Sequence, residues 1–426
     1  TKKDEPKKEE PKKEGTKPYE GKTLKVAGLK GGYGEEGWKA VVAKFEELTG
    51  AKVDLKLEKN IDEVVRPQIQ AGDVPDVLYF SVGQKSGLTE TLVKEKLLVE
   101  ITDVLDMKVL GEEKKVSEKI LPGFLDTFIT MPYGDGKTYL APLFYSPTGL
   151  WYNRALFKED GGKYELPKTF EEFFKLGETA KADGIALFTY PVAGYFDTFV
   201  FSLINEVGGP TLFNKLMNYD VEAWKTEAKP VFETIGKIAP YLEPNTVAQA
   251  NNEGFTKNQQ SVIDSKALFM PNGTWIIGEM KKTTPEGFKW GYMALPQFNE
   301  NGRYAYTFFE QAYIVNGAKE VELAKVFLSF LYSDEAAKLF ASNGGAIQPI
   351  FGASKLAQEE LQAVYNIYET GVKASMGSFA NAPAVEGADR NDLFKTIDSV
   401  MNGSKTVEQW HTDYVKVIEA IKAAIQ

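Results

Sequence analysis

The sequence predicts an α/β protein in which parallel strands alternate with helices. Short apolar segments typical of strands alternate with segments of helical periodicity over most of the 426 residues. The length favours two or three domains, and a hydrophobic content of 43% can fill one large core or two moderate ones. Strand–helix–strand units of this type build doubly wound sheets, which bind ligands beyond the carboxyl ends of their strands.

The first part of the chain alternates most regularly. We expect strands at residues 24–29, 53–57 and 76–80, and helices at 36–49 and 64–71. Residues 30–34 and 81–84 follow the first and third of these strands. Because both loops lie at carboxyl ends, they are places where we expect a ligand.

The remainder of the chain continues the alternation less regularly. A capping box begins one helix, since Glu172 follows Thr169 after three residues, and Gly208-Gly209 ends another. Beyond residue 353 we expect helices joined by loops. The expected strands are 139–144, 149–152, 185–190, 289–295 and 306–315, and the expected helices are 169–182, 197–207 and 320–332.

One dodecapeptide, Lys266 to Ile277, combines a strand, a turn and an aromatic residue. The strand is Ala267 to Met270, the turn is Pro271-Asn272-Gly273, and Trp275 opens an amphipathic helix. A rigid indole on a fixed turn suits a sugar ring, whose C–H faces stack on aromatic rings. A tryptophan more commonly fills a core, so this interpretation depends on the rest of the chain.

Composition argues against several functional classes. A net charge of −10 leaves no basic surface for phosphates, so we expect no nucleic-acid partner. The chain has no cysteine, and His411 is its only histidine, which argues against metal sites and triad hydrolases. We expect neither a metal nor a cofactor. No apolar run is long enough to span a bilayer.

The opening residues have a different composition from the rest. Residues 1–15 form two proline-punctuated blocks of mixed charge, which we expect to be disordered and extended. They are either a charged tail without a role or, with the residues up to 22, a tether that holds the body away from a membrane. The chain shows no signal peptide. We therefore expect a processed, extracellular protein that is lipid-anchored through an upstream residue.

A glycine-rich loop offers an alternative function. Gly32, Gly34 and Gly37 form a G-x-G-x-x-G pattern after a strand, and Glu58 stands 21 residues beyond the last of them. This spacing is that of a dinucleotide-binding loop, so an NAD-dependent oxidoreductase is one alternative. The pair Glu35-Glu36, however, would repel a pyrophosphate at the start of the helix.

Acidic residues raise a second alternative, a glycosidase. Asp135, Glu206, Glu310 and Asp389 each flank glycines or aromatic residues, but nothing fixes two of them at the separation that this chemistry needs. Most carboxylates in such an acidic chain are solvated. Glu310 differs because it lies between Phe308-Phe309 and an apolar segment. There it is either paired or accepts hydrogen bonds from a ligand.

Aromatic residues gather at the expected loops and strand ends, near neutral amides. Each alone is more often a core residue, but together they indicate a carbohydrate-binding groove that lacks a catalyst. The aromatic residues are Tyr33, Phe144, Tyr145, Tyr195, Phe196, Trp275, Tyr306, Phe308 and Phe309, and the amides are Asn251, Asn252, Asn272 and Gln348.

Ordered motifs from residue 23 onward resemble the extracellular solute-binding proteins of sugar ABC transporters, of the maltose-binding type. Trp275 lies in the most informative of them. The motifs are Phe45 to Gly50, Ile69 to Phe80 with its Gly-Asp-Val-Pro-Asp-Val core, Tyr139 to Phe144 with Gly149 to Asn153, Lys266 to Trp275, Ala324 to Ala336, and Asn402 to Glu408.

This resemblance implies a two-lobed type II periplasmic-binding-protein fold, with each lobe a βα sandwich and the ligand at the hinge. We expect one lobe to comprise residues 23–137 and 290–349, and the other 138–289 and 350–426. It further implies a monomer without enzymatic activity that captures a carbohydrate and delivers it to the permease of an ABC transporter.

The resemblance also implies site residues. Trp275 matches a sugar-stacking tryptophan, Tyr195 a contact from a second-lobe loop, and Phe80 a first-lobe aromatic residue. The acidic residue expected at 81–84 is missing, which argues against maltose, and residues 251–259 are similar to the subgroup that binds N-acetylglucosamine or its oligosaccharides. The expected ligand contacts are Trp275, Tyr195, Phe196, Phe80, Glu310, Tyr145, Asn272, Tyr33, Gly32, Ser81 and Asn252.

Overall fold

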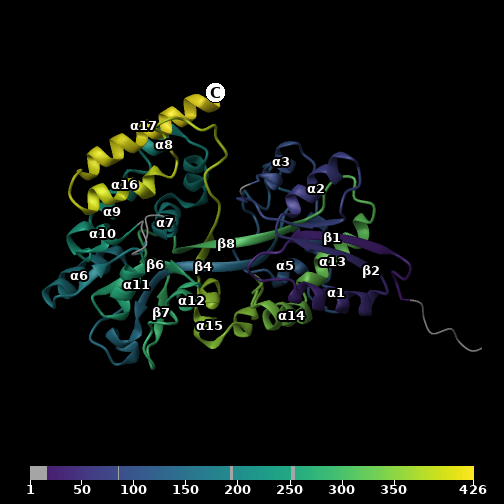
Figure 1. Cartoon of the computed structure of the whole chain (residues 1–426), viewed down its shortest axis with the longest axis horizontal. Coiled ribbons are helices and arrows are strands. Elements are labelled where there is room, and N and C mark those ends of the chain that lie inside the picture. The colour runs from purple at the N-terminus through teal and green to yellow at the C-terminus, as the bar shows by residue number, and fades with distance from the viewer. Residues whose placement is uncertain (1–16, 85, 192–194, 251–254) are drawn as a thin grey trace, which may run out of the picture.

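The computed structural model describes residues 17–426 apart from 85, 192–194 and 251–254. Two lobes lie side by side, joined by two long strands (Figure 1). The strands are β1 (Thr23–Leu29), β2 (Lys52–Glu58), β3 (Val77–Tyr79), β4 (Ala141–Asn153), β5 (Ala186–Phe188), β6 (Ala267–Gly273), β7 (Trp290–Met293), β8 (Tyr304–Tyr313) and β9 (Lys373–Ser375).

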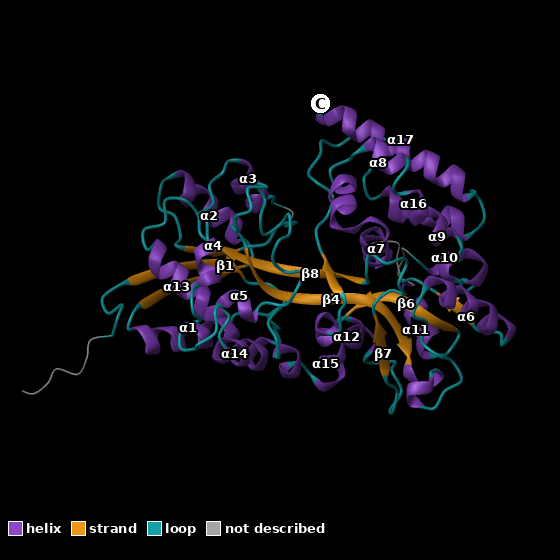
Figure 2. Ribbon diagram, turned by 180° about the vertical axis from the view of Figure 1, so that it is seen from behind, coloured by secondary structure: helices purple, strands orange, loops and turns teal. Residues whose placement is uncertain are grey.

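Helices cover the strands in both lobes (Figure 2). Those of the first lobe, with α13 and α14 returning to it late in the chain, are α1 (Glu36–Thr49), α2 (Ile61–Gln70), α3 (Leu88–Lys94), α4 (Thr102–Asp106), α5 (Val116–Lys119), α13 (Val321–Leu331) and α14 (Asp334–Gly344). The others are α6 (Phe170–Ala182), α7 (Phe196–Met217), α8 (Val221–Lys225), α9 (Lys229–Gly236), α10 (Thr246–Gln249), α11 (Phe255–Ile263), α12 (Ile276–Met280), α15 (Glu359–Tyr365), α16 (Asp392–Met401) and α17 (Val407–Ile425).

A single connected sheet passes through both lobes. Its order is β2-β1-β3-β8-β4-β6-β5, with β7 paired to β4 and β9 to β8. In lobe 1, β1 runs parallel to β2 and β3, as predicted from the strand–helix alternation. The long strands β4 and β8 are antiparallel to each other and cross from one lobe to the other (Figure 2).

Two predicted interruptions of strands are wrong because pairing with a neighbouring strand overrides local turn propensity. The predicted strands at 139–144 and 149–152 are parts of the continuous strand β4. The predicted turn Pro271-Asn272-Gly273 continues β6, where Pro271 lies opposite Leu150 of β4. Since β5 pairs only with residues 267 and 269 of β6, Pro271 lies where β6 has a free edge, a position that tolerates proline.

Two other boundaries also differ from the prediction. The backbone N–H of Tyr19 donates to the carbonyl of Thr49 over 3.0 Å, so the ordered body begins before the predicted limit at residue 23. Of the predicted disordered tether 1–22, residues 1–16 lie outside the described residues. Beyond residue 353, where we expected only helices and loops, β9 pairs with β8.

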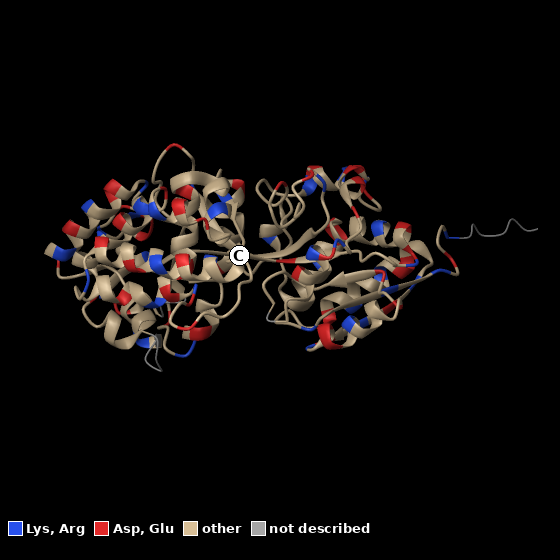
Figure 3. Cartoon of the chain, turned by 90° about the horizontal axis from the view of Figure 1, so that it is seen from above, with Lys and Arg blue, Asp and Glu red and all other residues tan. Residues whose placement is uncertain are grey.

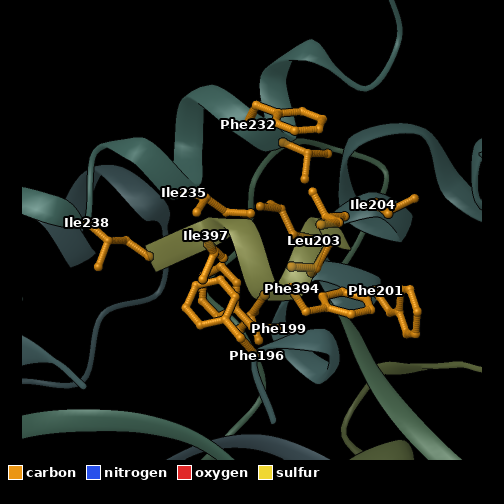
Figure 4. Close-up of a cluster of buried hydrophobic side chains, with 14 of the residues drawn as sticks. Phe196, Phe199, Phe201, Leu203, Ile204, Phe232, Ile235, Ile238, Phe394 and Ile397 are labelled. Carbon is orange, nitrogen blue, oxygen red and sulfur yellow. The ribbon is translucent and has the colours of Figure 1, made fainter. Parts of the chain in front are cut away.

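The core of lobe 2 forms around α7, most of which is buried. Figure 4 shows Phe199 and Leu203 of α7 with Ile235 of α9 and Ile397 of α16 in one apolar cluster. The helix was predicted to end at Gly208-Gly209. The structure confirms this end, because the chain kinks at Gly209, whose φ of 68° favours glycine, and a separate helical segment then continues to Met217.

The core of lobe 1 depends on a buried carboxylate. Asp76, 2% exposed, accepts hydrogen bonds from the backbone N–H groups of Lys25 (2.8 Å), Lys319 (2.9 Å) and Glu320 (2.9 Å). These bonds tie β1 to the start of α13, which lies far along the chain. The second aspartate of the Gly-Asp-Val-Pro-Asp-Val motif, Asp76, therefore has a structural role.

We expect Asp76→Asn to destabilise the protein by about 3 kcal/mol, because an amide presents a donor to N–H groups that need an acceptor. The thermal unfolding transition measures this. Asp73→Asn is the matched control, since Asp73 forms an exposed ion pair with Lys25 at 2.9 Å. An equal, small effect of both substitutions would refute the structural role of Asp76.

Candidate functional site

The crossing strands bring a set of side chains to the junction of the lobes. In the β4–β8 pairing, Phe144 lies opposite Glu310 and Ser146 opposite Phe308. Residues opposite each other in an antiparallel pair share a face, as do residues two apart on one strand. These four side chains therefore lie on one face of the sheet where the lobes meet.

Lobe 2 adds Trp275 to this face. Trp275 is the N-cap residue of α12 and is half-buried, and its ring centroid lies 5.8 Å from Phe308 and 5.7 Å from Tyr195. The hydroxyl groups of Thr274 and Ser146 are 2.8 Å apart. A Cβ atom on Gly273 would lie 2.2 Å from the indole, so only glycine lets the ring fold back over β6.

Lobe 1 adds Tyr33 from the loop after β1. Its ring lies 5.3 Å from that of Phe144, the residue opposite Glu310. Burial raises the pKa of Tyr33 well above its ordinary value, and the nearby Tyr365 and Glu310 raise it further. Gly32 beside it is exposed. The predicted contacts Trp275, Tyr195, Glu310 and Tyr33 thus surround one region, although they come from distant parts of the chain.

Two carboxyl groups in this region have raised pKa values. Burial raises the pKa of Glu310 to about 7, and its Oε2 atom is buried without a hydrogen-bond partner. Burial also raises the pKa of Asp197, in the first turn of α7, to about 7, against a smaller opposite effect of the Thr198 backbone N–H. A buried oxygen without a donor is an acceptor available to a ligand.

Five predicted contacts prove to be buried in the protein, which argues against direct contact with a ligand in this conformation. Each of these side chains lies on the face of its strand or helix that packs against the protein. The sequence pattern did not show which face that would be. Phe80 lies in the core of lobe 1, Phe196 packs on Phe188, Tyr145 donates to the carbonyl of Tyr365, Asn272 donates to Gln259, and the hydroxyl of Ser81 accepts from the backbone N–H of Gln311. Asn252 lies outside the described residues.

Asn272 nevertheless supports the site through a chain of hydrogen bonds. Its amide donates to Oε1 of Gln259 (2.8 Å), and the amide of Gln259 donates to Glu279 (3.1 Å). The phenol of Tyr195 donates to the other oxygen of Glu279 (2.8 Å). This chain fixes Tyr195 beside Trp275.

Sequence reasoning missed Tyr365 and Asp197 as neighbours of the site. The hydroxyl of Tyr365 forms hydrogen bonds with Thr274 and Ser146. Burial raises the pKa of Tyr365, and these hydrogen bonds lower it by a smaller amount. Phe308 was noted only as one member of an aromatic group. No local motif marks these residues, because the crossing of β4 and β8 brings them together.

The glycine-rich loop has a packing role. A Cβ atom on Gly37 would lie 3.1 Å from the ring of Phe340 in α14, and Glu35 pairs with Lys30 (2.9 Å) and Lys39 (2.8 Å). These contacts account for the loop without a dinucleotide.

Three of the candidate glycosidase carboxylates have partners of their own. Glu206 is buried and accepts from the backbone N–H groups of Phe298 and Tyr304. Asp389 pairs with Lys395, and Asp135 accepts from the phenol of Tyr139. Only Glu310 of the four has a side-chain oxygen that is buried and unpartnered in the described structure.

Charge is distributed without a dominant cluster. Acidic and basic residues are intermixed over both lobes in Figure 3. Within residues 17–426, leaving out the gaps named above, no group of three or more His, Cys, Asp or Glu side chains could hold a metal ion. In the same described part of the chain, no helix combines the length and the apolar character needed to cross a membrane.

Comparison with solved structures confirms the two-lobed α/β fold. The bacterial solute receptor AcbH, reported to prefer β-D-galactopyranose exclusively, aligns with a TM-score of 0.74 at 18% identity over 95% of this chain and 99% of its own. A family 1 extracellular solute-binding protein from Bifidobacterium longum subsp. infantis aligns with a TM-score of 0.67, also at 18% identity, over 95% and 99% of the two chains.

Sequence relatives include sugar-binding proteins. The chain is 28% identical over 275 residues to the diacetylchitobiose binding protein NgcE of Streptomyces coelicolor, covering 63% of this chain and 55% of that protein. It is 26% identical over 276 residues to the multiple sugar-binding protein of Streptococcus mutans, covering 61% and 58%. The chain thus spans little more than half the length of these relatives.

The family comparison covers most of the fold described above. The model of the bacterial extracellular solute-binding proteins matches residues 31–338, from the loop after β1 to α14. This range includes both crossing strands, Trp275 and Glu310. The chain belongs to the bacterial extracellular solute-binding protein family.

Proposed function

We propose that this protein captures a sugar or oligosaccharide between its two lobes and delivers it, chemically unchanged, to the permease of an ABC transporter. One observation carries the proposal. Aromatic rings from lobe 2 (Trp275, Tyr195), from a crossing strand (Phe308) and from lobe 1 (Tyr33) lie near the junction of the lobes, where one oxygen of Glu310 is buried without a hydrogen-bond partner.

This combination of groups suits a carbohydrate. The apolar C–H faces of a sugar stack on aromatic rings, and its hydroxyl groups donate to acceptors such as Glu310. The name of NgcE adds diacetylchitobiose to the ligands to be tested, which supports our expectation of an amino-sugar-containing glycan. The partners that Glu206, Asp135 and Asp389 have within the protein support capture without hydrolysis.

Binding would favour closure of the lobes. A ligand that contacts Trp275 and Tyr33 together interacts more strongly with a closed form, so it shifts the population toward that form.

The proposal also covers location and partners. An extracellular protein tethered through the residues that precede Tyr19 to a lipid anchor upstream would present bound sugar to a permease in the same membrane. It would act as a monomer, with residues 23–137 and 290–349 in one lobe and 138–289 and 350–426 in the other, and would need no cofactor. The family description as extracellular supports the location.

We expect Trp275→Ala to weaken glycan binding by about 1–3 kcal/mol, the range for loss of an aromatic stacking partner. A thermal-shift screen over sugars, including N-acetylglucosamine and its oligomers, selects the ligand, and calorimetry then measures affinity. The sugar should be recovered intact from the mixture. Trp290→Ala, in which the indole packs on Trp151 and Phe288, is the control and should retain affinity. Unchanged affinity of Trp275→Ala would remove Trp275 from the site.

We expect glycan affinity to rise with pH between 6 and 8. Burial raises the pKa of Glu310 to about 7, so the ionised form, which accepts hydrogen bonds at both oxygens, becomes dominant in this window. Glu310→Gln should flatten the profile, and Asp197→Asn tests the contribution of the other carboxyl group with a similar pKa. Calorimetry in matched buffers measures both. A Glu310→Gln variant that keeps the wild-type profile would contradict this role.

A further inference from the structure

The exposure of Phe308 is unusual for its position. Thr307 and Phe309, its neighbours on β8, are 1% and 9% exposed, whereas Phe308 is 45% exposed. The other large apolar side chains that are exposed in the described part of the chain lie in loops or helices, and Phe308 is the one that lies in a strand. A phenylalanine left open in a central strand loses the stabilisation that burial would give it.

The surroundings of Phe308 indicate what would cover it. Its ring lies 5.8 Å from Trp275, with the planes inclined by 58°, and 5.3 Å from Tyr306. One sugar ring cannot stack face to face on both of these rings at once when they are inclined to this extent. Two consecutive rings of a glycan can, because the glycosidic bond between them lets their planes differ.

Strand β8 also fixes the position of Glu310, whose Oε2 atom is a hydrogen-bond acceptor without a partner. Glu310 is two residues beyond Phe308 on the same face, a separation of about 7 Å along β8. A ring stacked on Trp275 alone leaves both Phe308 and the unpartnered oxygen of Glu310 uncovered. A second ring over Phe308 brings its hydroxyl groups toward that oxygen and toward Tyr33 of lobe 1.

We infer that the site takes a glycan of at least two sugar rings, with Trp275 as the platform for one ring and Phe308 as the platform for the next. The inference rests on the proposed carbohydrate-binding function and adds the ligand's minimum length to it. It also gives a direct role in recognition to β8, the crossing strand on which Phe308 lies.

Affinities for chains of increasing length test this inference. Calorimetry is performed with the monosaccharide, disaccharide and trisaccharide of the N-acetylglucosamine, maltose and galactose series. For the series that binds, the disaccharide should bind wild-type protein roughly tenfold or more tightly than the monosaccharide, the increment of one stacking contact. In Phe308→Ala this increment should disappear, while the affinity for the monosaccharide changes by less than about threefold.

Controls separate this result from a general loss of structure. Phe351→Ala removes a ring that is similarly exposed, at 49%, but lies beyond the crossing strands, and it should keep the length dependence. Trp275→Ala should weaken binding at every length. Since Phe308 is exposed, its substitution should leave the unfolding temperature nearly unchanged.

Two results would overturn the inference while leaving the proposed function intact. Wild-type protein could bind the monosaccharide as tightly as the disaccharide. Alternatively, Phe308→Ala could weaken the two by the same factor, which would place a single ring in the corner between Trp275 and Phe308. Absence of binding in all three series, at any length, would instead overturn the proposed function and this inference together.

Discussion

The antiparallel pairing of β4 and β8 is the constraint on which the rest of this structure depends. These strands join the two lobes, and their register sets Phe144 against Glu310 and Ser146 against Phe308. Because residues two apart share a face, the same pairing that holds the lobes together also presents one row of side chains at their junction. A shift of the register by one residue would turn Phe308 and Glu310 to the other face. Structural continuity and recognition therefore depend on the same backbone hydrogen bonds.

Contacts within lobe 2 fix the side chains of Trp275 and Tyr195 beside this row of β4 and β8 side chains. Gly273 admits the indole of Trp275, and the bond between Thr274 and Ser146 links the end of β6 to β4. The chain from Asn272 through Gln259 and Glu279 fixes the phenol of Tyr195. A pre-organised site loses less conformational entropy when a ligand binds. The buried amides thus contribute to affinity without contacting the ligand.

The elements of the first lobe could be predicted from the sequence, and much of the site could not. Alternating apolar residues and a glycine at the end of α1 define β1, α1 and β2 locally, and the structure confirms them. Trp275 could be singled out because its strand and helix adjoin it in sequence. Phe308 and Tyr365 gain their importance only through the crossing of β4 and β8. Tyr145 lies next to Phe144 in sequence, but its hydroxyl points into the core toward Tyr365, and side-chain identity alone does not predict that direction.

Glu206, which is buried, and Glu310, which is partly buried, differ in the hydrogen-bond donors that the fold provides for them. Burial raises the pKa of Glu206 to about 8, although two backbone N–H groups and the charge of Arg303 oppose that effect. Because those N–H groups belong to Phe298 and Tyr304, the carboxyl group of Glu206 links α7 to the start of β8. Burial alone raises the pKa of Glu310, to about 7. In both cases the folded pKa lies above the ordinary value of 4.5, so the contribution of each group to stability falls as pH rises from about 4.5 toward the folded value. At neutral pH the fold therefore tolerates at Glu310 a partly ionised carboxyl group whose Oε2 atom has no hydrogen-bond donor. Such a group is typical of a position selected for binding, because donors from a ligand supply what the fold leaves out.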